Sequence, residues 1–224
     1  MKPLHSWTVN DIQARSIQDE LRSRVITDAI IPTPRFIAGA DVSYSRKTNF
    51  QFAAVKVFKY PQLEHVDSAT SVSEVKFPYI AGLLTFREGP VLLEALRKLK
   101  IMPDVVMFDG QGVAHPKNIG IASHMGLWLD LATIGCAKSR LVGEYEPVGP
   151  DFGDKSVLTY SGNKVGYVLR TRQKVKPVFI SPGHKINAEQ SVNIVQNTLK
   201  GFRLPEPVRQ AHLTVNQMRK KLES

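Results

Sequence analysis

Cysteine and long apolar runs are almost absent from this 224-residue sequence. Its one cysteine, Cys136, cannot form an internal disulfide and lies in an apolar stretch, which is typical of a small buried side chain in a reducing compartment. No apolar run approaches membrane-spanning length, and the first residues lack the apolar core of a signal peptide. We therefore expect a soluble cytoplasmic protein with no membrane partner.

Acidic residues are also scarce. The chain has 20 Asp and Glu against 30 Lys and Arg, a net charge of +10. This excess suits a polyanionic partner, either nucleic acid or an anionic membrane surface, although a generally basic soluble protein is the alternative. The 42% hydrophobic content can fill a full core, and no repeat or linker divides the chain. We expect one domain over residues 1–224, acting as a monomer.

The first half of the chain predicts a helix, a set of strands and a second helix. Apolar residues recur at helical spacing over residues 8–26, with Thr8 or Asn10 available as the cap. Turn residues separate three β-rich runs typical of an antiparallel meander, namely residues 35–45, 51–60 and 64–77. The second helix is expected over residues 89–99, with Pro90 in its first turn, where a missing N–H costs nothing.

The second half alternates strands with helices. The pattern predicts strands at residues 104–109, 133–138 and 177–180, a hairpin over residues 157–172, a helix at about residues 118–131 and two final helices. Antiparallel strands followed by alternating units indicate an α/β fold with a mixed central β-sheet and helices on both faces.

Three acidic residues stand at positions suited to chemistry. The alternation in "IAGADVSY" places Asp41 on the opposite face from Ala38 and Ala40. Asp109 closes a buried strand at the carboxyl end, where open α/β sheets place their ligands. Glu88 stands just before the expected second helix. Taken singly, each acid is explained as well by a turn, a helix cap or the helix dipole.

Convergence of these acids would favour a metal site. Carboxylate oxygens suit Mg²⁺ or Mn²⁺, which keep several waters and complete their shell with a phosphate. The sequence has neither the Cys and His spacing of a zinc site nor a Gly-Lys phosphate loop. A magnesium-type centre is therefore the metal hypothesis that these residues support.

Several motifs together resemble the endonuclease V family. They are "DVSY", "PYIAGLLTFREGP", "FDGQGVAHPKNIGIASHMG", "IGCAKSRLVG", "GYVLRTR", "KPVFISPGHKI" and "PVRQAH", which run from about Arg35 to His212. The resemblance implies a ribonuclease H-like fold and a divalent metal. It also implies hydrolysis of a phosphodiester one nucleotide beyond a deaminated adenine, on its 3′ side, leaving 3′-hydroxyl and 5′-phosphate ends.

The resemblance also implies the catalytic residues. Asp41, Glu88 and Asp109 match the acidic metal site of the family, His212 matches a histidine beside it, and Lys138 matches an active-site lysine. In such chemistry Lys138 could stabilise charge on phosphorus, and His212 could orient or deprotonate the attacking water. Without the resemblance they would be a solvated lysine and a surface histidine.

The resemblance assigns recognition of the base to two further segments. It places Tyr79 and Ile80 in the wedge that separates DNA strands, although Ala81 replaces the second proline of the family's usual PYIPG. It also implies that Gly110, Gln111, Gly112 and His115 lie near the base. Glycines could let a flipped base approach the backbone, whereas the simpler alternative is a tight turn. Covering the core is likewise the alternative role for Tyr79 and Ile80.

Cations concentrate late in the chain. Residues 155–188 contain seven Lys or Arg and no Asp or Glu. Within this segment Arg170, Arg172, Lys174 and Lys176 alternate with other residues, so an extended chain would place all four on one face. We expect a groove that tracks phosphates, and a charged, solvated sheet edge is the alternative.

The overall hypothesis is a Mg²⁺-dependent DNA repair endonuclease for deoxyinosine, in which Mn²⁺ also supports activity. Two alternatives stay open. One is a ribonuclease H-like nuclease that prefers inosine in RNA or branched nucleic acid, and the other is a binding module without catalysis. The intact set of acids argues against the second, because a pure binder gains nothing from carboxylates buried beside phosphate.

Overall fold

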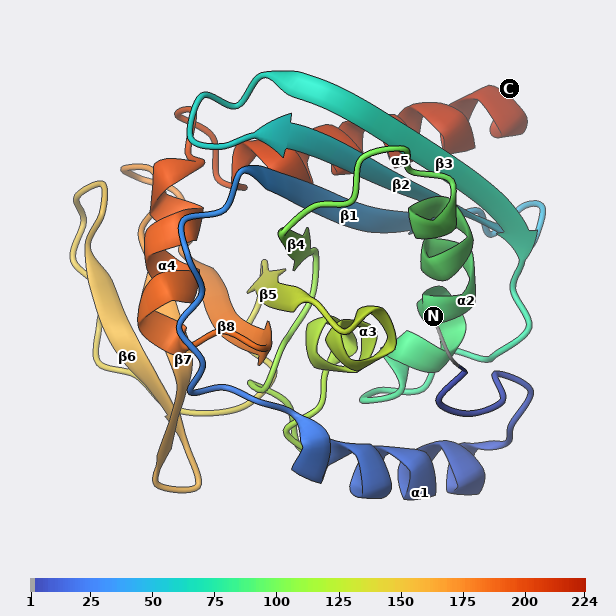
Figure 1. Cartoon of the computed structure of the whole chain (residues 1–224), viewed down its shortest axis with the longest axis horizontal. Helices are drawn as coiled ribbons and strands as arrows, with labels where there is room; N and C mark the ends of the chain where they lie inside the picture. Colours follow the sequence, from blue (N-terminus) through green and yellow to red (C-terminus); the bar gives the residue numbers. More distant parts are fainter. Residues whose placement is uncertain (1–2) are drawn as a thin grey trace.

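A single mixed sheet forms the centre of the computed structural model, which describes residues 3–224 (Figure 1). Residues 1 and 2 of the expected domain lie outside the described residues. The strands are β1 (Phe36–Tyr44), β2 (Phe50–Lys59), β3 (His65–Glu74), β4 (Val105–Phe108), β5 (Ala132–Ala137), β6 (Lys155–Tyr160), β7 (Asn163–Leu169) and β8 (Val178–His184). Their order across the sheet is β3-β2-β1-β4-β5-β8-β7-β6.

Strand direction explains where a site can form. The expected meander is present, since β1, β2 and β3 pair antiparallel. By contrast β1, β4 and β5 are parallel neighbours. Strand β4 ends opposite Ala40, whereas β1 continues to Tyr44, so the segment that follows β4 lies beside the second half of β1.

Helices cover both faces of the sheet, as predicted (Figure 1). They are α1 (Asp11–Leu21), α2 (Leu84–Arg97), α3 (Ile121–Leu129), α4 (Ala188–Asn197) and α5 (Glu206–Glu223). The apolar faces of α2 and α3 pack on one side of the sheet, and those of α4 and α5 on the other. Among residues 3–224, no helix has the length and apolar character needed to cross a membrane.

The first helix confirms one of the two expected caps. Asn10 caps α1 through its side chain, which accepts from the backbone N–H of Gln13, while the Gln13 side chain accepts from the N–H of Asn10. This reciprocal pair satisfies two backbone donors that the first turn would otherwise leave free. Asn10 therefore sets the start of the helix, and Thr8 lies outside it.

The start of α2 corrects the sequence prediction. The helix begins at Leu84, so Pro90 lies in its interior rather than in its first turn. A proline there removes one N–H from the helix ladder, and tertiary packing must offset that loss. Gly89 provides such packing, because a Cβ at this position would lie 2.6 Å from Cη2 of Trp7. Consequently Glu88 is held within the helix and does not precede it.

The last central strand is longer than predicted. The expected strand ended at residue 180, whereas β8 continues through Pro182 and Gly183 to His184. The pairing of β5 with β8 shifts register next to Ile134, which is opposite Pro182. A proline is tolerated where the ladder is already irregular, and this context cannot be read from the local sequence.

Candidate active site

Two of the predicted acids are neighbours on parallel strands. Ala40 of β1 pairs with Phe108 of β4, and the next residue of each chain segment is an aspartate. The backbone N–H of Asp109 donates to the Ala40 carbonyl at 3.1 Å, which extends the strand pairing by one step. Asp41 and Asp109 are therefore fixed side by side at the carboxyl end of β4.

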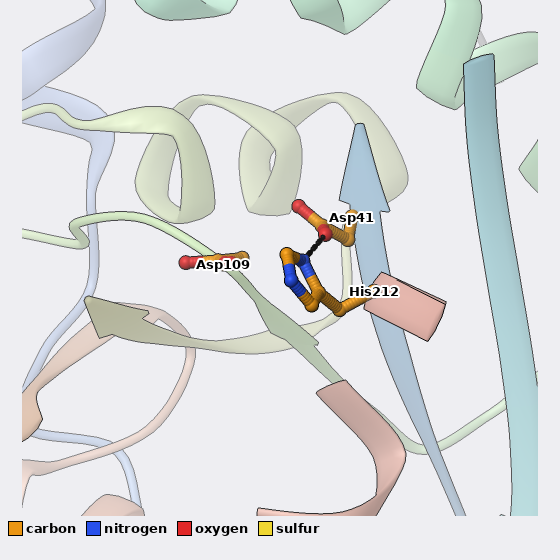
Figure 2. A group of neighbouring side chains, drawn as sticks. All are labelled: Asp41, Asp109 and His212. Carbon is orange, nitrogen blue, oxygen red and sulfur yellow. Dashed lines mark hydrogen bonds and ion pairs between the residues drawn. The ribbon is translucent and has the colours of Figure 1, made fainter. Parts of the chain in front are cut away.

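Helix α5 brings His212 to these aspartates (Figure 2). The helix can approach β1 closely because a Cβ on Gly39 would lie only 2.0 Å from the carbonyl carbon of Pro207. His212 Nδ1 lies 2.7 Å from Oδ2 of Asp41. One ligand atom from each of Asp41, Asp109 and His212 lies within 4.8 Å of the others. Such a group has the donor types and spacing to hold a metal ion.

Asn216 defines which nitrogen of His212 carries the proton. It is one helical turn beyond His212, and its Nδ2 donates to Nε2 of the histidine at 3.1 Å. Neutral His212 therefore carries its proton on Nδ1 and donates it to Asp41. Ser43 in turn donates to Oδ1 of Asn216 at 3.4 Å. Sequence reasoning missed Asn216, whose only signal is its i, i+4 spacing from the histidine.

Glu88 lies close to this group but outside the set of three. It comes from the second turn of α2. Burial raises the pKa of Glu88 well above its ordinary value, and the charges of Asp41 and Asp109 raise it further against the opposing effect of Arg87. The pKa of Asp109 is raised for the same reasons, first by burial and then by Asp41. The site thus concentrates negative charge that the protein only partly neutralises.

Lys138 provides part of that neutralisation. It follows β5, and its Nζ forms an ion pair and hydrogen bond with Oδ2 of Asp109. The lysine and His212 both oppose the rise in the pKa of Asp109. The structure therefore places Lys138 at the acidic group rather than free in solvent.

A pocket of about 360 Å³ opens beside Asp109 and Lys138. Its lining includes most of the residues predicted to lie near a base, namely Tyr79, Ile80, Gly110, Gln111 and His115. Gly112 is different, because a Cβ there would lie 2.1 Å from the carbonyl oxygen of Pro182 in β8. The missing side chain of Gly112 thus allows the loop to pack on the sheet.

The side chains of Gln111 and His115 are held by protein partners. Gln111 Nε2 donates to the carbonyl of Ser139 at 2.9 Å. His115 Nδ1 accepts from the backbone N–H of Lys117 at 3.1 Å, so its Nε2 donates to the Gly82 carbonyl at 3.0 Å. Burial lowers the pKa of His115 to about 4, which keeps the ring neutral. These hydrogen bonds join the loop after β4 to the segment after β5 on one side of the pocket and to Gly82 on the other.

The predicted wedge forms one rim of the pocket. Tyr79 is 74% exposed, whereas Ile80 packs against the buried cluster that contains Phe77. The N–H of Leu83 donates to the Ile80 carbonyl at 2.9 Å, and Gly82 has φ of 83°, which defines a type II turn. Ala81 occupies its second position. The exposure of Tyr79 argues against a core-covering role for that ring.

The basic segment does not form the extended stripe that its alternation predicted. Arg170 donates to the carbonyls of Val148, Gly149 and Val175, so its guanidinium is used within the fold. The chain then turns, and Lys174 has φ of 58°. Arg172, Lys174 and Lys176 are exposed. The prediction failed because backbone carbonyls of a neighbouring loop compete for Arg170, which local periodicity cannot reveal.

Sheet order and the acidic group at the ends of its parallel strands define the ribonuclease H-like class of nucleases. A family model for endonuclease V matches residues 19–213. Endonuclease V of Dehalococcoides mccartyi strain CBDB1 is 46% identical over 218 residues, which cover 97% of this chain and 98% of the relative. The chain therefore belongs to the endonuclease V family and is an endonuclease, a hydrolase.

Solved structures agree with this assignment. Endonuclease V from Streptomyces avermitilis is 38% identical with a TM-score of 0.91, and the match covers 98% of this chain and 97% of that chain. Endonuclease V of Ciona intestinalis was solved in complex with a 23-mer DNA containing an inosine followed by a ribo-adenosine. It is 28% identical with a TM-score of 0.82, and the match covers 96% of this chain and 100% of that chain.

Proposed function

We propose that this endonuclease recognises deoxyinosine in DNA and, with Mg²⁺, hydrolyses the phosphodiester one nucleotide beyond it on the 3′ side. The products carry 3′-hydroxyl and 5′-phosphate ends. The observation that supports this most is the convergence of Asp41, Asp109 and His212 beside a pocket with an exposed tyrosine at its rim. The DNA-bound relative from Ciona intestinalis supports the substrate class. We further propose one domain that acts as a monomer in the cytoplasm.

The residues at the site fit a hard divalent cation. Asp41 and Asp109 offer carboxylate oxygens, and the charges of both act on the buried carboxyl group of Glu88, which is proposed as a further ligand. Burial, and then the charges of neighbouring carboxylates, raise the pKa of Glu88 and of Asp109, and a bound cation would oppose both effects. When bound, Mg²⁺ or Mn²⁺ would lower the pKa of a water and stabilise charge on the scissile phosphate.

The chain's own groups supply the remaining chemistry. Lys138 Nζ is beside Asp109 and can donate to a phosphate oxygen that gains charge in the transition state. His212 is held by Asp41 on one nitrogen and Asn216 on the other, so its ring is oriented before the substrate arrives. It can exchange Asn216 for a water at Nε2 and accept a proton there.

The pocket is suited to an extruded purine. Its volume of about 360 Å³ exceeds the space that one base requires, and its lining combines apolar side chains with the loop backbone at Gly110 and Gln111. Tyr79 at the rim can stack in the place of the withdrawn base. Exposed Arg172 and Lys174 are proposed to contact flanking phosphates, and Arg170 has a structural role instead.

Inosine in RNA is the second candidate substrate. The nucleic acid bound to the relative from Ciona intestinalis carries a ribo-adenosine directly after the inosine. A ribose 2′-hydroxyl beside the lesion is thus compatible with binding in that protein. Discrimination between DNA and RNA depends on how this chain contacts that hydroxyl.

One cleavage assay tests the function. Oligonucleotides with inosine or adenine at the same position, made as DNA and as RNA, would be incubated with Mg²⁺, Mn²⁺ or a chelator. We expect metal-dependent cleavage one nucleotide 3′ of inosine in DNA and little cleavage of the adenine control. Equal cleavage of inosine and adenine would contradict lesion recognition, and faster cleavage of the RNA would favour the second candidate.

A further inference from the structure

The carbonyl oxygen of Gly82 is the acceptor of two buried side-chain hydrogen bonds. Gln18 of α1 donates through Nε2 at 2.7 Å, and His115 donates through Nε2 at 3.0 Å. The two donors are 1% and 4% exposed. Since donors in such surroundings lose a partner without gaining water, both bonds resist opening. Both bonds hold the wedge at Gly82, the third residue of its type II turn.

Helix α1 contacts both walls of the pocket through neighbouring residues. Gln18 binds the wedge at Gly82, whereas Asp19 forms an ion pair with Lys117 at 2.9 Å, two residues after His115. Ala14 adds an apolar contact, since it packs in the cluster of Phe77, Leu83 and Phe86. Helix α1, the blue helix in Figure 1, therefore joins the wedge to the loop after β4 as a strap.

The second position of the turn shows why such a strap is needed. Proline is favoured at this position of a type II turn, where it fixes φ and limits alternative conformations. This chain has Ala81 there, and Ala81 is exposed. The turn consequently lacks the stiffness that a proline would give its own backbone, and depends more on external contacts.

We propose that Gln18 is a positioning residue for strand separation: its bond to the Gly82 carbonyl holds the wedge in place while Tyr79 replaces the withdrawn base. This inference rests on the proposed function. The side chain of Gln18 donates to Gly82 in the wedge and is not part of the acidic group, so its effect on cleavage should arise through the wedge. A positioning residue of this kind affects substrates that must be unpaired and spares those that are already single-stranded.

The test compares Gln18→Leu with a matched control, Gln190→Leu. Gln190 is a half-buried glutamine on α4, away from the pocket. Its Nε2 donates to the Ile31 carbonyl at 2.8 Å, and its Oε1 accepts from the Ile31 N–H at 2.9 Å. Single-turnover cleavage would be measured at saturating enzyme on inosine in duplex and in single-stranded DNA. We expect Gln18→Leu to slow duplex cleavage about tenfold and single-strand cleavage less than about threefold. The control should affect both substrates equally.

Two further measurements separate positioning from general damage. Adding Ala81→Pro to Gln18→Leu should restore part of the duplex rate, because proline stiffens the same turn from within. With a chelator present, 2-aminopurine placed next to inosine should brighten on binding wild-type protein and brighten less with Gln18→Leu. Gln18→Asn, which keeps the amide but shortens its reach, provides a second variant if the leucine variant folds poorly.

The outcomes distinguish this inference from the proposed function. If the wild-type protein cleaves inosine and adenine alike, the proposed function fails. If the wild-type protein is selective but Gln18→Leu and Gln18→Asn slow both substrates equally, or if Ala81→Pro gives no rescue, Gln18 is only structural and the inference is overturned.

Discussion

The acidic site and a histidine cluster on the other side of α2 bury ionisable groups in opposite ways. At the acidic site, Glu88 and Asp109 have raised pKa values because they are buried beside like charge. In the cluster, the Nε2 atoms of His5 and His124 lie 2.7 Å apart, and the indole N–H of Trp128 donates to the same His5 nitrogen at 3.2 Å. Burial lowers the pKa of both histidines, so they remain neutral.

The two regions differ in whether their buried groups need a further partner of opposite charge. His5 donates from Nδ1 to the Ser6 carbonyl at 2.8 Å, and its Nε2 accepts from His124, with the Trp128 N–H close to the same nitrogen. Nδ1 of His124 is buried without a hydrogen-bond partner, but both rings are neutral and need no opposite charge. At the acidic site, Lys138 and His212 partly offset the charge of Asp109, and Arg87 partly offsets that of Glu88, yet the pKa of both carboxyl groups stays raised. Buried rings that stay neutral are typical of a structural role, whereas buried carboxylates beside one another indicate a site for a cation.

Asp109→Asn should have the largest effect. The carboxylate stands between Asp41 and Lys138, and its loss removes a central metal ligand while the basic surface stays intact. We expect cleavage of inosine DNA to fall by roughly 10³-fold or more, with binding largely retained. Single-turnover rates and binding titrations would measure both. Near-normal turnover would show that the site works without this ligand.

Glu88→Gln should reduce cleavage roughly 10²-fold and make the metal-free protein more stable. The raised pKa of Glu88 means that the folded state favours the neutral acid. Wild-type stability in chelator should therefore fall as pH rises above the ordinary value of 4.5, and the variant should escape that fall. Thermal unfolding between pH 4 and 8, with chelator and with Mg²⁺, measures the difference. If Glu88→Gln were less stable than the wild-type protein in chelator at pH 8, burial beside Asp41 and Asp109 would not destabilise the charged form of Glu88.

His124→Phe should leave selectivity unchanged and lower stability by about 1 kcal/mol at pH 7, because the bond to His5 is lost. A histidine with a lowered pKa stabilises the fold above its ordinary value near 6.5 and loses that contribution as pH falls. The wild-type protein should therefore lose stability more steeply towards pH 5 than the variant. Denaturant unfolding at several pH values tests this, and parallel curves would show that His124 does not titrate on unfolding.

Basic side chains of residues 170–174 also divide into groups with and without protein partners, and replacing the exposed ones should have a smaller effect than the changes above. Arg170 is satisfied by three carbonyls, whereas Arg172 and Lys174 are exposed. Replacing Arg172 and Lys174 together with Ala should reduce the slope of log K against log[salt] by up to about two units, for inosine and undamaged duplex alike. Arg170→Ala should mainly reduce stability. An unchanged slope in the double variant would favour a solvated edge without phosphate contacts.

The local sequence pattern predicted most helices and strands, but it could not predict the contacts between elements that are distant in the sequence. Alternation along β1 correctly placed Asp41 opposite Ala38 and Ala40, because one side of that strand packs under α2 and the other under α5. The predicted position of Glu88 was wrong, because Pro90, a residue type that often starts a helix, lies inside α2, where the neighbouring Gly89 packs against Trp7. The contact of Gln18 with Gly82 joins residues 64 positions apart, and no spacing in the sequence indicates it. Asn216 had one signal, its i, i+4 spacing from His212, which alone does not indicate a hydrogen bond.

The hydrogen bond between Asp41 and His212 joins residues 171 positions apart, because α5 packs across β1 and β2. Contacts of such long range form late when a chain folds, since closing so large a loop must come first. The same helix has few buried residues in its last turns. Helix α5 should therefore detach as a local unfolding unit, and mild denaturant should abolish cleavage before the central sheet melts.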